Sequence, residues 1–149
     1  MRLDDWPERF DAFIEEWRYR PFCWAQFDCI RFADEAHYVQ TGKHIFNDWF
    51  GTYTTEWGAY LNYHRQLKRS GHYNIIKAIN SRLKAVDWIV PPRGAIIGRG
   101  DYGALMVTEI ALGVALGDKV AFLGYDGLEF SPVKPTDLIW VVERTRLRC

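Results

Sequence analysis

The residue pattern of the chain changes near residue 85, and this change restricts the fold more than any other feature of the sequence. Before it, apolar residues recur at intervals of three and four, as they do on one face of an amphipathic helix. After it come short runs rich in β-branched and aromatic residues, separated by glycine turns. Helices followed by strands predict an α+β fold rather than alternating βαβ units. We therefore expect N-terminal helices packed on a small C-terminal antiparallel β-sheet.

Helices are predicted throughout the first half of the chain. They are expected at residues 1–20, 28–40, 55–69 and 73–83. Asp28 suits the start of the second helix, because an aspartate side chain accepts a hydrogen bond from a main-chain N–H of the first turn. Gly42 and Gly71 suit the ends of the second and third helices, because glycine readily adopts the left-handed conformation found there.

Short strands are predicted in the second half. They are expected at residues 95–97, 105–110, 113–116, 119–123, 127–130 and 138–143. A chain of 149 residues is long enough to bury one sizeable core, so we expect a single domain over residues 1–149. Its parts would be an N-terminal helix (1–20), a helical half (21–84), the antiparallel sheet (85–143) and a basic tail (144–149).

Composition excludes several classes of partner. Lys and Arg together number 19 and so do Asp and Glu, so a net charge of zero gives no reason to expect binding to nucleic acid or a membrane.

Cys23, Cys29 and Cys149 form no C-x-x-C pair, which argues against a disulfide scaffold or a zinc site, and no cofactor is expected. The N-terminus has no apolar signal core, so we expect synthesis and folding in the cytoplasm.

Cys29 is the candidate with the clearest chemistry. It stands where the second helix is predicted to begin, and the positive end of a helix dipole favours a thiolate. A thiolate at that place can serve as the nucleophile of a cysteine hydrolase, provided that a base accepts the thiol proton. From residue type alone, a buried small side chain is the commoner role of such a cysteine.

The segment around Cys29 resembles the nucleophile segment of the NlpC/P60-type, papain-like cysteine peptidases. More closely, the chain is similar to a family of small phage and prophage tail-tip proteins related to that fold. The matching positions are Trp24, Asp28, Cys29, Thr41-Gly42, Tyr53-Thr54-Thr55, Arg93-Gly94-Ala95, Leu112–Gly117 and Trp140. The resemblance implies a papain-like fold, a nucleophile at Cys29 and a location in the phage virion.

The same resemblance predicts that the catalytic base is lost. In the peptidases a histidine opens the strand that matches Leu112–Gly117, and here that position holds Ala111. All the histidines of this chain precede the predicted sheet; they are His37, His44, His64 and His72. His37 lies eight residues along the Cys29 helix, roughly 12 Å from its start, which is too far for direct contact.

Aromatic residues are abundant, at 16% of the chain. Aromatic side chains in the centre of an interface contribute much of its binding energy. Our interface candidates are Trp49, Phe50, Tyr53 and Trp57.

Two further patterns resemble functional motifs, but we interpret them as structural. Residues 98–103 match G-x-G-x-x-G, but no βαβ unit surrounds them, so we predict a polar hairpin turn. His37, His44 and Asp48 fit no familiar metal-ligand spacing, so we expect surface or capping roles for them.

The sequence therefore predicts a structural component of a bacteriophage tail tip or baseplate. Its expected partners are other tail proteins: a hub, distal tail or central-fibre protein. The alternative is an active cysteine peptidase or amidase that cleaves peptidoglycan during DNA entry, with Cys29 as nucleophile. A small binding module without phage context is the third possibility.

Overall fold

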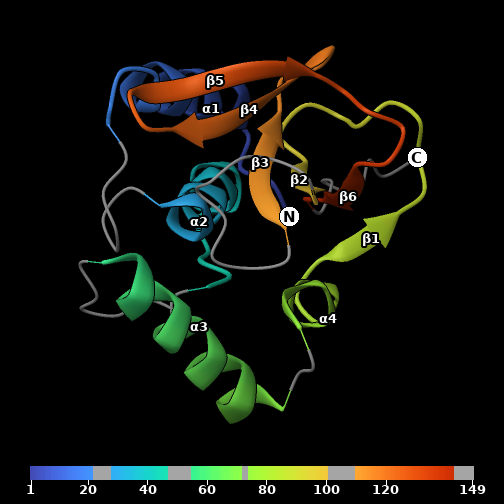
Figure 1. Ribbon diagram of the computed structural model, residues 1–149. Helices are drawn as coiled ribbons and strands as arrows, with labels where there is room; N and C mark the ends of the chain where they lie inside the picture. The colour runs from blue at the N-terminus through green and yellow to red at the C-terminus, as the bar shows by residue number, and fades with distance from the viewer. Residues whose placement is uncertain (22–27, 47–54, 72–73, 101–109, 143–149) are drawn as a thin grey trace.

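The computed structural model of the chain describes residues 1–21, 28–46, 55–71, 74–100 and 110–142 (Figure 1). Its helices are α1 (Trp6–Trp17), α2 (Cys29–Thr41), α3 (Glu56–Ser70) and α4 (Ile75–Asn80). Its strands are β1 (Lys84–Val86), β2 (Ile96–Arg99), β3 (Ala111–Ala115), β4 (Lys119–Gly124), β5 (Gly127–Pro132) and β6 (Leu138–Val141). Helices precede strands throughout the described part, so the predicted α+β fold is confirmed. None of the described helices is long and apolar enough to cross a membrane.

Local sequence signals explain where the helices begin and end. The side chains of Asp28, Thr55 and Asn74 each accept a hydrogen bond from a main-chain N–H of the first turn of α2, α3 and α4. Gly42 and Gly71 follow α2 and α3 with φ angles of 76° and 73°. A residue with a side chain adopts such angles only with backbone strain. These ends agree with the predicted ones to within a residue or two.

The strands form one antiparallel sheet in the order β1-β6-β2-β3-β4-β5. β6, the last of the described strands, lies between β1 and β2, with Trp140 opposite both Ala85 and Ile96. β1 was not among the predicted strands, and the fourth helix was expected to continue to residue 83. Helix α4 instead ends at Asn80, whose side chain accepts a hydrogen bond of 2.8 Å from the indole of Trp140.

The helices cover one face of the sheet and form the main core with it. Helix α2 lies against β3, and α1 lies beside the β4–β5 hairpin, where the main chain of Leu128 donates to that of Arg18 (Figure 1). Phe13 and Phe32 stack between α1 and α2 with ring centroids 5.4 Å apart. The main core also contains Phe10, Trp17, Ile96, Leu112, Val114 and Trp140.

A smaller apolar cluster lies on the other face of the sheet, and we call it the far-face cluster. Its members are Ala95, Ile97, Ala111, Ala115, Val120, Phe122 and Ile139. Arg99 lies over the ring of Phe122, is 2% exposed, and forms two hydrogen bonds with the Asp137 carboxylate, at 2.7 and 2.8 Å. It also donates to Ser131 and to the carbonyl of Pro132, so it links β2 to the end of β5.

The position of Arg99 corrects the prediction of a polar turn over residues 98–103. Gly98 and Arg99 belong to β2, opposite Leu112 and Ala111 of β3. Glycine is required at residue 98 by packing, since a Cβ there would come within 3.0 Å of Ile110 and Trp140. Residues 101–103 lie outside the described residues, as does most of the strand expected at 105–110.

Candidate functional site

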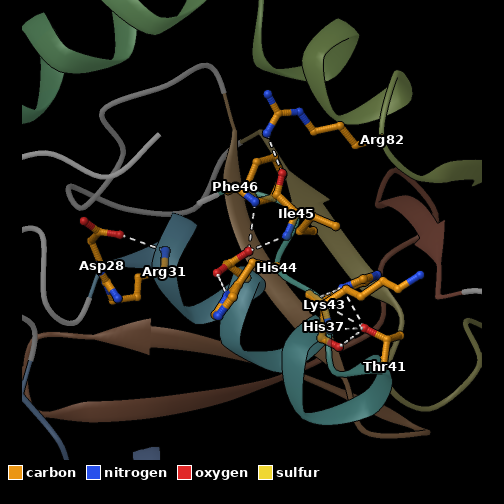
Figure 2. Close-up of polar contacts among 10 residues, drawn as sticks. Asp28, Arg31, His37, Thr41, Lys43, His44, Ile45, Phe46 and Arg82 are labelled. Carbon is orange, nitrogen blue, oxygen red and sulfur yellow. Dashed lines mark hydrogen bonds and ion pairs between the residues drawn. The ribbon is translucent and has the colours of Figure 1, made fainter. Parts of the chain in front are cut away.

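Asp28 and Cys29 lie together at the start of α2. The backbone of Asp28 is extended, with φ −105° and ψ 173°, and its carboxylate accepts a hydrogen bond of 2.9 Å from the main-chain N–H of Arg31 (Figure 2). Cys29 is the first residue of the helix and is partly buried against the main core. The structure therefore gives this cysteine the helix-terminal position that the sequence predicted.

The electrostatic surroundings of Cys29 oppose ionisation. Burial and, to a lesser extent, the negative charge of Asp28 raise the pKa of the thiol to about 12. Hydrogen bonds from the main chain at Leu112, Cys29 and Ile30 act in the opposite direction but are weaker. The expected lowering of this pKa is therefore wrong, because desolvation outweighs the favourable field of the helix N-terminus. At neutral pH Cys29 is a thiol, and the thiolate is the nucleophilic form.

Strand β3 supplies apolar side chains beside Cys29. Leu112 belongs to the main core with Cys29, and so does Ile110, the residue just before the strand. Ala111, where the peptidase pattern places a histidine, belongs to the far-face cluster instead. The β3 residues that share the core with Cys29 are thus aliphatic, and no described histidine is among the groups that shift its pKa.

His37 has a structural role at the end of α2. It is 7% exposed, and its Nδ1 lies 2.7 Å from the carbonyl oxygen of Lys43 and 3.2 Å from the Thr41 hydroxyl (Figure 2). A carbonyl oxygen only accepts, so Nδ1 carries the proton and donates it. Burial lowers the pKa of His37, which keeps the ring neutral. Of the expected surface or capping roles, this geometry fits capping, whereas a surface role is wrong for His37 because its side chain is buried.

His44 is held by a buried carboxylate. Its Nδ1 lies 2.5 Å from Oδ2 of Asp34, while Oδ1 of Asp34 accepts hydrogen bonds from the main-chain N–H groups of Ile45 and Phe46 (Figure 2). The ring stacks on Tyr38 with centroids 4.3 Å apart. Asp34 thereby fixes the segment that follows α2 against the helix.

A metal site at this place is not well supported by the donor set. Ligand atoms of Asp34, Glu35 and His44 lie within 4.8 Å of one another. Both oxygens of Asp34, however, already accept the hydrogen bonds that hold residues 44–46. We therefore infer that the cluster anchors residues 44–46 to α2.

The remaining candidates are Asp48, His64 and His72. Asp48 and His72 lie outside the described residues, and His64 packs edge-on against Tyr60 and Tyr63 of α3.

Helix α3 lies away from the sheet (Figure 1), and several of its large apolar side chains are exposed to solvent. Trp57, Tyr60 and Leu61 are 66%, 41% and 43% exposed, and we call these residues the α3 row. The rings of Trp57 and Tyr60 stack with centroids 5.5 Å apart. Of the predicted interface residues, Trp57 is thus on the surface, whereas Trp49, Phe50 and Tyr53 lie outside the described residues.

Sequence reasoning missed a cavity of about 520 Å³ beside β1 and β6. Its apolar lining comes from Leu83, Trp88, Val141 and Val142. Beyond Trp88, the side chains of Ile89 and Val90 are strongly exposed. The apolar run directly before Pro91-Pro92 was the feature of the sequence that could have indicated this cavity. A fully buried strand would also explain such a run.

A protein-family model matches this chain. Neither the curated proteins nor the solved structures include a match to this chain. A family model described as a domain of unknown function (DUF6950) matches residues 1–142, which is nearly the whole chain. The chain belongs to the DUF6950 family.

Proposed function

We propose that this chain is a non-catalytic structural domain that binds other proteins, as a component of a bacteriophage tail tip or baseplate. The observation that carries the proposal is the α3 row: two stacked aromatic rings and a leucine exposed along one side of a helix. The phage setting rests on the resemblance of the Asp28-Cys29 segment and the later motifs to phage tail-tip proteins of papain-like ancestry.

The spacing of the α3 row suits recognition by a partner. Residues 57, 60 and 61 are three and four positions apart, so their side chains lie on one side of the helix. Amphipathic helices that dock into grooves use anchors at this spacing. The opposite side of α3 is already occupied, because Ala59 and Gln66 are buried there. Next to them, the hydroxyl of Tyr63 accepts a hydrogen bond from the main-chain N–H of Ile75 of α4. One side of the helix is therefore packed against the rest of the domain, while the α3 row remains accessible to a partner.

The surroundings of Cys29 support a non-catalytic role. A cysteine hydrolase needs a thiolate and a base within hydrogen-bond reach. Here the pKa of the thiol is raised to about 12, and the β3 residues that share its core are aliphatic. We infer that the nucleophile position has become part of the core, as in a peptidase fold retained for assembly.

Co-purification with neighbouring tail proteins tests this function. The chain would be co-expressed with the hub, distal tail and central-fibre proteins encoded beside it, and complexes separated by size. We expect a stable complex with at least one of them. Trp57→Ala and Tyr60→Ala should each weaken it by about 2 kcal/mol, roughly 30-fold in Kd. Tyr19→Ala is the control, because Tyr19 is 75% exposed but lies after α1 and outside the α3 row.

Two results would contradict the proposal. The first is that the chain forms a complex with none of these partners. The second is turnover of purified peptidoglycan by the wild-type chain that disappears in Cys29→Ala, which would support the peptidase instead.

A further inference from the structure

We propose that the cavity beside β1 is a second binding site, which takes an extended, acidic peptide segment of a partner protein that adds to the sheet along β1 and inserts a tyrosine side chain. The site lies at the sheet edge rather than on α3. Its test therefore does not depend on the α3 row or on the phage setting.

Strand β1 provides the edge. It is an end strand of the sheet, and among the described residues it pairs only with β6. Lys84 and Ala85 are exposed and Val86 is half-buried. An edge strand leaves main-chain N–H and C=O groups that an added strand can pair with.

The cavity adjoins this edge directly. Lys84 of β1 and Val141 of β6 are partners in the register, and both line the cavity. A peptide paired along β1 therefore passes the cavity beside Lys84. The volume of about 520 Å³ lies within the range of ligand pockets and is ample for one aromatic side chain.

The lining selects the inserted side chain. Leu83, Trp88 and Val142 offer apolar contact to a ring. His37 also lines the cavity, and because its Nδ1 donates to Lys43, its Nε2 remains as an acceptor. No described residue bonds to Nε2. A tyrosine satisfies both features, since its ring is apolar and its hydroxyl can donate a hydrogen bond to Nε2.

Charge selects the flanking residues. The cavity is lined by the cations Arg82 and Lys84, and none of the described lining residues is acidic. The guanidinium of Arg82 donates to the carbonyl of Ile45, which fixes its position (Figure 2). Lys84 stands exposed on the edge itself. Carboxylates beside the tyrosine would be attracted to this site, whereas basic residues would be repelled.

Selection from a displayed library of random ten-residue peptides tests the site on the whole chain. Enriched sequences would be synthesised with a fluorophore and measured by anisotropy. We expect a tyrosine flanked by Asp or Glu. Trp88→Ala should weaken binding about tenfold or more, and Lys84→Glu should reverse the preference for acidic flanks. Lys119→Glu is the charge control, because Lys119 is exposed on β4, four strands away in the sheet order.

Replacing the peptide tyrosine by phenylalanine tests the hydrogen bond without altering the protein. We expect at least a fivefold loss of affinity in the wild-type chain. Binding of p-cresol, the tyrosine side-chain analogue, serves as a second arm. The proposal is overturned if no peptide is enriched over a Trp88→Ala control, even if p-cresol binds. It is also overturned if the selected peptides are basic, or if Lys84→Glu and Trp88→Ala leave binding unchanged.

Discussion

The main chain of Leu112, in β3, forms a hydrogen bond with the thiol of Cys29 at the start of α2. The bond connects the nucleophile position of the resemblance to the strand that would carry its base. It lowers the pKa of the thiol, but by less than burial and Asp28 raise it, to about 12. The first turn of α2 and β3 thus form the part of the core in which a catalytic pair would have to lie.

Cys29 is expected to react slowly with thiol reagents. A pKa of about 12 leaves about one thiol in 10⁵ ionised at pH 7, and the thiolate is the reactive form. In a Cys23→Ser/Cys149→Ser background, labelling of the folded protein at neutral pH should be far slower than that of a free cysteine. Labelling in denaturant should proceed at the ordinary rate. Rapid labelling of the folded protein would contradict this account.

The stability of the protein should fall in alkaline solution partly because of Cys29. The pKa of this thiol is raised in the folded state, from 9.0 to about 12. Its contribution is therefore fully present below pH 9.0 and is lost as the pH rises from there toward about 12, since only the unfolded thiol ionises in that window. Urea unfolding of wild type and Cys29→Ala between pH 8 and pH 11 isolates the effect. The difference between the two should change with pH, and a constant difference would refute the assignment.

Asp34→Asn should destabilise the fold by about 2–4 kcal/mol, because an amide nitrogen would face donors that now meet a buried carboxylate. The donors are the main-chain N–H groups of Ile45 and Phe46 and the ring of His44. Urea unfolding measures the change, and the exposed Asp118→Asn provides the control. A loss below about 0.5 kcal/mol, typical of surface changes, would show that Asp34 does not anchor the segment.

Arg99→Met should cost about 3–5 kcal/mol, because it leaves the buried Asp137 carboxylate without its cation. Asp137→Asn alone should be similarly destabilising. The double variant Arg99→Met/Asp137→Asn should lose less than the sum of the two, since neither partner then remains as an unpaired charge. Additive losses in this double-mutant cycle would mean that the ion pair does not couple β2 to the segment before β6.

The helical half of the fold was predictable because its signals are local. Asp28, Gly42 and Gly71 act within one turn of the helix that they begin or end, so residue type and spacing sufficed. β1 was not predictable in the same way. Its residues give no alternating pattern, and it exists because Ala85 lies opposite Trp140, more than fifty residues later in the chain.

The candidate site was predictable in position but not in chemistry. The sequence places Cys29 at a helix start, which is a local property. Its pKa depends on how deeply α2 packs against Leu112, a long-range contact that no spacing reveals. The prediction for Arg99 was wrong for the same reason. Its glycine-rich surroundings in the sequence indicated an exposed turn, and only the ion pair with the distant Asp137 explains its burial.

The place of β6 in the sheet has a consequence for how the protein is made. Residues 138–141 leave the ribosome after the other described strands, yet they lie between β1 and β2 in the sheet. Until they arrive, β2, β3, β4 and β5 can pair as one sheet, β1 lacks its described strand partner, and the indole that reaches Asn80 is missing. β1 is therefore synthesised well before the strand that joins it to the rest of the sheet, so it can enter the sheet only after residues 138–141 have been made.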